Sequence, residues 1–139
     1  MTECLDFQGA KLALFIGDRL AVIRRDDRPG LAWAGWLDLP GGGREPDEAP
    51  ETCVIRETQE ELGLHLTPDK LVWRRHYATP ASAWFFAAHL PEDRAAAVVF
   101  GDEGQGWYLM PPQAFITSEA AIPHFRDRVR DYLAARGAL

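Results

Sequence analysis

The segment between residues 39 and 64 restricts the fold more than any other part of the sequence. Three consecutive glycines follow Pro40, a combination that ends a strand and permits backbone conformations closed to other residues. Pro50 then suits a first helical position, and Gly63 suits the residue that ends a helix. Between them, a helical spacing relates Val54, Ile55, Thr58 and Leu62. The segment therefore predicts a strand, a glycine loop and a helix with one buried face.

A neighbouring face of the same helix is crowded with negative charge. Residues three and four positions apart share a helix face, so Glu57, Glu60 and Glu61 project together. Like charges this close repel one another and destabilise the helix unless something positive compensates. Hard divalent cations such as Mg²⁺ prefer carboxylate oxygens, and Mg²⁺ is usually held by one or two carboxylates and substrate phosphates. We interpret the helix as a metal-binding ridge beside a loop whose Gly42 and Gly43 approach phosphate oxygens. Taken singly, each feature also fits a solvated helix face or a plain turn.

The rest of the chain predicts several strands and one more helix. The short strand 36–39 leads into the glycines, and an apolar stripe over 122–133 predicts a terminal amphipathic helix. Gly17 and Asp18 separate two runs that we expect to be adjacent antiparallel strands. The strands expected from β-leaning composition are 10–15, 20–23, 36–39, 70–78, 83–90, 97–100 and 107–110. This order favours an α+β fold with a mixed sheet and a single domain over residues 1–139.

Composition excludes several classes of protein. The formal net charge is -6, and no run of Lys and Arg is present to bind long nucleic acid. No apolar stretch is long enough for a membrane span, and the first residues lack a secretion signal, so we expect a cytoplasmic protein. Cys4 and Cys53 match neither a disulfide framework nor a zinc site, which predicts two reduced thiols. Oligomeric state is left open.

The segment from Gly42 to Leu64 resembles the Nudix box. That pattern is Gly, five residues, Glu, seven residues, Arg-Glu, an aliphatic residue, any residue, Glu-Glu, any residue, Gly and an aliphatic residue. Its specified positions are filled by Gly42, Glu48, Arg56, Glu57, Glu60, Glu61, Gly63 and Leu64. Thr58 departs from the pattern by standing where a larger aliphatic residue is usual, and the approach strand 36–40 is similar to that of the family. The resemblance implies an α/β/α sandwich with a mixed central sheet.

The resemblance also implies roles for individual residues. Mg²⁺ or Mn²⁺ would be ligated by Glu57, Glu60 and Glu61 with the Gly41 carbonyl, and Glu48 would hold Arg56 in an ion pair that supports the loop and helix. Gly42 and Gly63 complete this structural support. A further metal-linked carboxylate is expected after the later strands, with Glu103 as candidate and Asp102 as second choice. The implied catalytic set is Arg56, Glu57, Glu60, Glu61 and Glu103, and the general base is left open among Glu57, Glu61 and Glu103.

Substrate contacts are less specified by the sequence. Arg24 and Arg25 follow the second strand and are candidates for binding phosphate, or else are solubilising surface residues. Five aromatic residues are candidates either for stacking on a base or for packing in the core: Trp33, Tyr77, Trp84, Phe86 and Trp107. The chain contains no Asn, which argues against an asparagine that reads a purine. Pro80 lies about where relatives that cleave ADP-ribose carry a proline, although a hairpin alone accounts for it.

These observations predict a metal-dependent pyrophosphohydrolase. Water would attack a phosphoanhydride of a small nucleoside diphosphate derivative, of the nucleoside triphosphate, ADP-ribose or nucleotide-sugar type. The alternative is a catalytically silent nucleotide-binding or sensor module of the same fold. Loss of box carboxylates would mark that alternative, and all three are intact in this chain.

Overall fold

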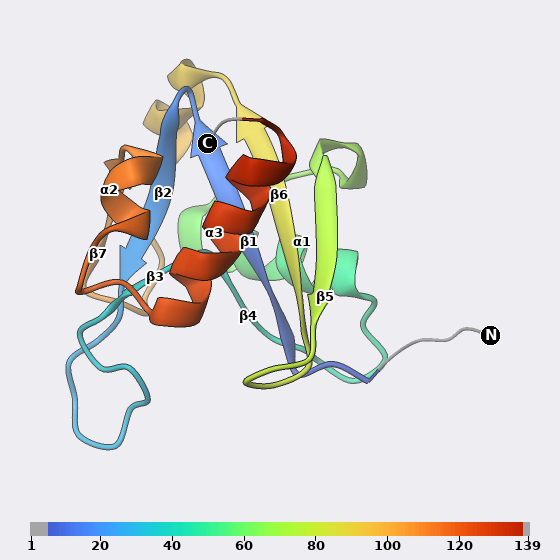
Figure 1. Ribbon diagram of the computed structural model, residues 1–139, viewed down its shortest axis with the longest axis vertical. Helices are drawn as coiled ribbons and strands as arrows, with labels where there is room; N and C mark the ends of the chain where they lie inside the picture. Colours follow the sequence, from blue (N-terminus) through green and yellow to red (C-terminus); the bar gives the residue numbers. More distant parts are fainter. Residues whose placement is uncertain (1–5, 138–139) are drawn as a thin grey trace.

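A mixed β-sheet forms the centre of the molecule (Figure 1). The computed structural model describes residues 6–137, so Cys4 and its expected free thiol lie outside the described residues. The strands are β1 (Gly9–Ile16), β2 (Arg19–Arg24), β3 (Leu37–Asp38), β4 (Gly41–Gly43), β5 (Trp73–Tyr77), β6 (Ala83–Leu90) and β7 (Gly106–Met110). The helices are α1 (Pro50–Leu62), α2 (Pro112–Ile116) and α3 (Pro123–Ala135), with 3-10 turns η1 (Pro68–Lys70) and η2 (Glu92–Ala97).

Strand β1 lies in the middle of the sheet and runs parallel to β6. The strand order is β3-β2-β1-β6-β5, with β4 also pairing β1 and β7 also pairing β2. Apart from β1 with β6, these strand pairs are antiparallel. One parallel pair among antiparallel ones makes the sheet mixed, as the sequence predicted.

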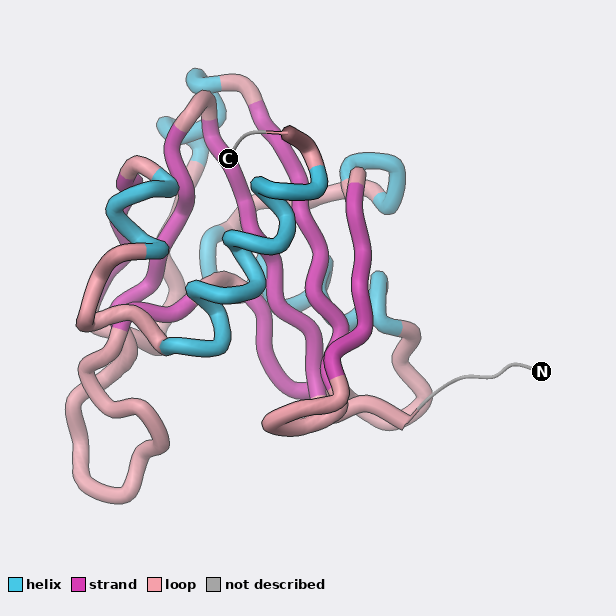
Figure 2. Tube along the Cα trace, viewed as in Figure 1, coloured by secondary structure: helices cyan, strands magenta, loops and turns pink. Residues whose placement is uncertain are grey.

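Helices cover both faces of this sheet (Figure 2). Because side chains alternate along a strand, β1 sends Phe15 to one core and Leu14 to the other. The first core packs against Phe115 of α2 and Val129 of α3, whereas the second packs against Val54 of α1. The result is the α/β/α sandwich with the α+β composition that the sequence predicted.

The first two strands diverge, and the chain between residues 37 and 43 fills the gap. Close to their turn, β1 and β2 pair with each other at Phe15 and Leu20. Further along, β2 pairs with β3 and β1 pairs with β4 instead. Pro40 joins β3 to β4, and its carbonyl accepts a hydrogen bond from the Leu12 amide at 2.9 Å. This crossing brings the glycines against the centre of the sheet.

Most predicted elements are confirmed, and one strand is wrong. The helix begins at Pro50 and ends before Gly63, whose φ of 68° is the left-handed conformation that suits glycine. Residues 97–100, predicted as a strand, instead lie along the end of α1, where the Val99 amide donates to the Leu62 carbonyl at 2.9 Å. The chain there is extended, but its partner is a helix terminus rather than a neighbouring strand.

Smaller differences concern short elements. The strand expected over 70–78 is shortened to β5, because η1 ends at Lys70 and residues 71–72 connect it to the strand. Helix α2 was not predicted, and its five residues are too few to display a helical repeat. The glycines expected as a loop form β4, which pairs Gly41 with Lys11. Cys53 is a buried free thiol, as predicted.

Candidate active site

The acidic residues of α1 form one ridge, with Arg56 lying against it. Arg56 Nη1 donates to Glu57 Oε2 at 3.0 Å and to Glu60 Oε1 at 3.2 Å. Glu57 is largely buried, whereas Glu60 is mostly exposed. Burial raises the pKa of the Glu57 carboxyl, although Arg56 opposes this increase. The like charges predicted from the sequence therefore do lie together, and one guanidinium compensates part of them.

Arg56 also fastens the loop before α1 to the helix. Its Nε lies 2.5 Å from Glu48 Oε2, its Nη2 lies 3.0 Å from Glu48 Oε1, and Nη2 also donates to the Gly43 carbonyl at 2.9 Å. Glu48 in turn accepts a hydrogen bond from the Glu45 amide at 2.8 Å. The hydrogen bond from Arg56 holds the pKa of the Glu48 carboxyl below its usual value. Such a two-pronged pair fixes the loop geometry.

The glycines bring backbone close to the ridge. The Gly41 amide donates to Glu61 Oε1 at 2.8 Å, and Gly41 has a φ of 124°, which favours glycine. A Cβ at Gly42 would lie 2.5 Å from Glu57 Oε1, so no side chain fits between β4 and that carboxylate. The Cys53 thiol donates to the Gly42 carbonyl at 3.6 Å. Gly42 is therefore required by its close approach to Glu57, whereas Gly41 is required by its backbone conformation and by the Ala10 carbonyl oxygen, 2.2 Å from where a Cβ would lie.

Glu61 has the most altered ionisation of the ridge. Burial raises its pKa to about 7, opposed by the nearby charge of Lys11 and by the Gly41 amide. A divalent cation would reverse this effect, because it favours the ionised form of a neighbouring carboxylate. A partly buried carboxylate without a full complement of positive charge is suited to binding a cation.

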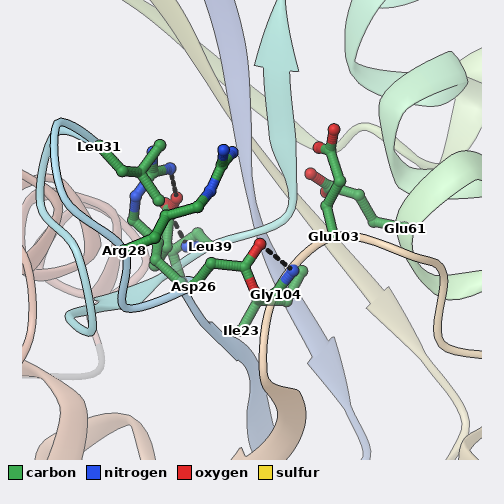
Figure 3. A pocket seen from close by; sticks show the side chains of 10 residues that line it. Ile23, Asp26, Arg28, Leu31, Leu39, Glu61, Glu103 and Gly104 are labelled. Atoms are coloured by element: carbon green, nitrogen blue, oxygen red, sulfur yellow. Dashed lines mark hydrogen bonds and ion pairs between the residues drawn. The ribbon is translucent and has the colours of Figure 1, made fainter.

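Glu61 and Glu103 line one cavity of about 200 Å³ (Figure 3). Arg25 and Arg28 belong to its lining as well, so carboxylates and guanidinium groups share a single space. The Gly104 amide donates to Asp26 at 3.3 Å, which ties the loop of Glu103 to the chain that follows β2. Glu103 thus lines the same cavity as Glu61 of the ridge, whereas Asp102 is not part of the lining.

The approach of Glu103 depends on the segment that was predicted to be a strand. The Gly101 amide donates to the Glu61 carbonyl at 2.9 Å, directly at the end of α1. A Cβ at Gly101 would lie 2.4 Å from the Glu60 carbonyl oxygen, so this contact also requires glycine. The last turn of α1 therefore supplies two carboxylates and anchors the loop that carries the next one.

Lys11 and Asp38 are site residues that the sequence reading missed. Lys11 Nζ donates to the Gly41 carbonyl at 3.0 Å and to Asp38 Oδ2 at 3.1 Å. Arg25 Nη1 lies 3.0 Å from the same Asp38 oxygen, and Asp38 is only 4% exposed. A lysine within the apolar run of β1 and an aspartate between two leucines were the available signals. Only the long-range strand pairing makes them neighbours.

The other predicted substrate residues take different places. Arg24 does not line the cavity, and its Nη1 donates to the Gly35 carbonyl at 2.7 Å. Among the aromatic candidates, Phe86 is fully buried, and Trp84, Tyr77 and Trp107 pack against the cores. Trp33 is 40% exposed and meets Trp36 and His124 edge-on. It is the most exposed of the five aromatic candidates.

The donor set fits a hard divalent cation. Glu57, Glu60 and Glu61 offer carboxylate oxygens beside the Gly41 carbonyl, and no soft ligand competes among them. Within residues 6–137, no three His, Cys, Asp or Glu side chains already converge on a single metal-sized point. Arg56 holds two of the ridge carboxylates, and Lys11 holds the Gly41 carbonyl. Metal binding would therefore require these side chains to exchange partners.

Comparison with solved structures agrees with this architecture. The crystal structure of the MutT protein from Methanosarcina mazei Go1 superimposes with a TM-score of 0.76 at 21% identity, covering 94% of each chain. Similarity at that level of identity establishes the fold. The sandwich and the acidic helix together define the class of Nudix-type domains.

Sequence comparison establishes the family. The family model described as NUDIX domain matches residues 8–132, and the chain belongs to this family. An uncharacterized Nudix hydrolase of Rhodococcus erythropolis is 31% identical over 108 residues, covering 70% of this chain and 58% of the relative. An RNA pyrophosphohydrolase of Gluconobacter oxydans (strain 621H) is 30% identical over 103 residues, covering 71% of this chain and 53% of the relative. The chain thus spans little more than half the length of these curated relatives.

Proposed function

We propose that this protein is a metal-dependent pyrophosphohydrolase that cleaves a phosphoanhydride bond of a small nucleoside diphosphate derivative by attack of water. The observation that carries the proposal is the single cavity lined by Glu61, Glu103, Arg25 and Arg28 beside the ridge of α1. Carboxylates there suit a cation, and guanidinium groups suit the phosphates that the cation binds. Residues 1–139 would act as one domain in the cytoplasm.

The side chains divide into two groups by charge. Glu57, Glu60 and Glu61 would hold Mg²⁺ or Mn²⁺ together with the Gly41 carbonyl, and the ion would neutralise charge on the phosphates. Arg25 would bind a phosphate oxygen in the same cavity, in an orientation fixed by the 3.0 Å ion pair between its Nη1 and Asp38 Oδ2. The Gly42 backbone lies directly against Glu57 with no side chain between them, which would keep this carboxylate in place beside the Gly41 carbonyl.

Glu103 is the proposed general base. Glu57 and Glu60 are engaged by Arg56, and Glu61 accepts the Gly41 amide, whereas Glu103 is exposed on a loop and lines the cavity. It would take the proton of the attacking water. Glu103→Gln is expected to lower kcat about a hundredfold or more while metal affinity changes little, and Asp102→Asn is expected to change neither. Equal loss in both variants would assign the role elsewhere.

The substrate class follows from charge and size. A chain with a formal net charge of -6 repels long polyanions, whereas a small phosphate ester fits a cavity of about 200 Å³. One relative is named an RNA pyrophosphohydrolase and another, from Escherichia coli (strain K12), an 8-oxo-dGTP diphosphatase. Pyrophosphate hydrolysis is common to both names. The absence of Asn from this chain argues against reading a purine through an asparagine.

The test is a panel of nucleoside triphosphates, ADP-ribose and nucleotide sugars, incubated with Mg²⁺ or with EDTA. Products should appear only with metal, and Glu60→Gln should reduce turnover strongly. Glu119→Gln, which removes an exposed carboxylate far from α1 in the sequence, is the matched control and should retain full turnover.

Binding without turnover would favour the alternative function. If no member of the panel is hydrolysed under either condition while ligands still bind, the hydrolase proposal is wrong. The protein would then be a nucleotide-binding or sensor module built on the same domain.

A further inference from the structure

A second cavity lies across the glycines from the acidic ridge. It has a volume of about 300 Å³, which is within the range of small-molecule sites, and is lined by residues including Lys11, Gly43, Pro80, Phe125 and Arg128. Arg25 lines both this cavity and the one that holds Glu61 and Glu103. A molecule that lies beside Arg25 is therefore able to contact both spaces.

Arg128 is the unusual residue of the second cavity. It lies on α3, is only 3% exposed, and its Nη2 donates to the Thr79 carbonyl at 3.0 Å. Its guanidinium lies over the rings of Tyr77 at 4.4 Å and Phe125 at 5.5 Å. Among the described residues no carboxylate is paired with it, and Asp131 one turn further accepts a hydrogen bond from Tyr77 instead. Burial lowers the pKa of Arg128 from its usual value.

A buried positive charge with so few partners is costly unless an anion completes it. Removing a charge from water carries a large free-energy penalty, and the attraction between a cation and aromatic rings compensates only part of it. Lys11 and Arg25 bring two more positive charges to the same lining, and a single carboxylate, that of Asp38, pairs with both. Positive charge in this cavity therefore exceeds negative charge, although the whole chain is acidic.

We propose that the second cavity binds a phosphate group of the substrate that is not part of the scissile anhydride. A guanidinium fork matches phosphate oxygens, and Lys11 adds a compact charge near the glycines. The inference rests on the proposed function, because it takes the scissile anhydride to lie in the cavity that Glu61 and Glu103 line. It selects, among nucleoside diphosphate derivatives, those that carry an additional phosphate.

The test measures equilibrium binding in EDTA, so that no turnover is needed. Three pairs of probes differ by one phosphate: NADP⁺ and NAD⁺, coenzyme A and dephospho-coenzyme A, adenosine tetraphosphate and ATP. In at least one pair, calorimetry should give about tenfold tighter binding of the phosphate-rich member, equal to about 1.4 kcal/mol. Net charge alone predicts the opposite order, because an acidic protein repels the more anionic ligand. Equal or weaker binding of the phosphate-rich member in all three pairs overturns the proposal.

Two sets of variants locate the preference. Arg128→Gln should bring the dissociation constants of the two members of a probe pair to about the same value. Arg130 is exposed on the same helix, and Arg130→Gln should preserve the difference between them. Because Arg128 is buried, Arg128→Gln is not the only test, and a second substitution at an exposed position leaves the core intact. Ala81 is exposed and lines the cavity, so Ala81→Glu should abolish the preference and Ala81→Gln should keep it. A preference that survives Ala81→Glu overturns the assignment.

Failure of the hydrolase proposal is distinguishable from failure of this one. If Mg²⁺ gives no turnover but the phosphate preference and its loss in Ala81→Glu are observed, the cavity is confirmed and the reaction is not. If turnover occurs but no probe pair shows a preference for the additional phosphate, the reaction is confirmed and the phosphate-binding role of the cavity is wrong.

Discussion

At the scale of single residues, Arg56 is the side chain on which most site contacts converge. It binds Glu48 through two nitrogens, the Gly43 carbonyl through one, and reaches both Glu57 and Glu60. A lysine keeps the charge but has no planar fork, so it satisfies only part of this set. The arrangement of loop and ridge therefore depends on the shape of the guanidinium, and charge alone does not reproduce it.

Arg56→Lys should lower both stability and activity. Loss of several charge-assisted hydrogen bonds is expected to cost about 1 to 3 kcal/mol in the free energy of unfolding, measured by urea denaturation. The value of kcat/KM should fall as the loop loses its fixed position. The control is Arg130→Lys, whose ion pair with Asp127 is exposed and worth little. Equal stability of the two variants would contradict the role given to Arg56.

Glu61 gives the metal-free protein a specific pH dependence. Its folded-state pKa of about 7 exceeds the ordinary value of 4.5, so between these values the folded protein binds more protons than the unfolded chain. Stability therefore falls as pH rises through this window, by at most about 3 kcal/mol. In EDTA, the stability of the wild type relative to Glu61→Gln should decrease between pH 5 and pH 7.5. A difference that stays constant with pH would contradict this account.

At the scale of elements, β4 lies where backbone must pass directly beside the carboxylate of Glu57. Gly42→Ala would place a methyl group 2.5 Å from Glu57 Oε1, whereas a methyl group at Gly43 meets nothing within 4 Å. Displacing a ligating carboxylate by about an ångström is expected to lower kcat/KM about a hundredfold. Gly43→Ala should stay close to wild type. Metal affinity measured by calorimetry should fall more in Gly42→Ala than in Gly43→Ala. Equal effects of the two substitutions would refute the close approach between Gly42 and Glu57.

The elements that the sequence predicted well carry their signals locally. Helix α1 has a proline at its start, a glycine at its end and a helical repeat between them, all within a short stretch. Residues 97–100 have strand-like composition, but their extended form is used to contact the carbonyls at the end of α1. Lys11 and Asp38 became neighbours only through β3 and β4, a contact that local patterns do not encode. Local signals thus located the ridge but not the ion pair between Lys11 and Asp38.

At the scale of the whole molecule, one sheet separates two cores. Phe85 and Phe86 are neighbours in β6, yet Phe85 packs with α2 and α3 and Phe86 packs with α1. Both are fully buried. Since β6 pairs with β1 along its whole length, loss of one core should disrupt the sheet that supports the other. The two layers are therefore expected to unfold together.

Phe85→Leu and Phe86→Leu should each destabilise the protein by about 1 to 3 kcal/mol while keeping a single transition. Trp73 packs against the first core and Trp107 against the second, so tryptophan fluorescence reports on both sides. Curves from fluorescence and circular dichroism should coincide in urea for the wild type and both variants. Val72→Ala, at a position that is 61% exposed, should change stability by less than about 0.5 kcal/mol. Two separate transitions in either variant would mean that the sheet does not couple the cores, and that the acidic ridge can lose its support while the opposite layer stays folded.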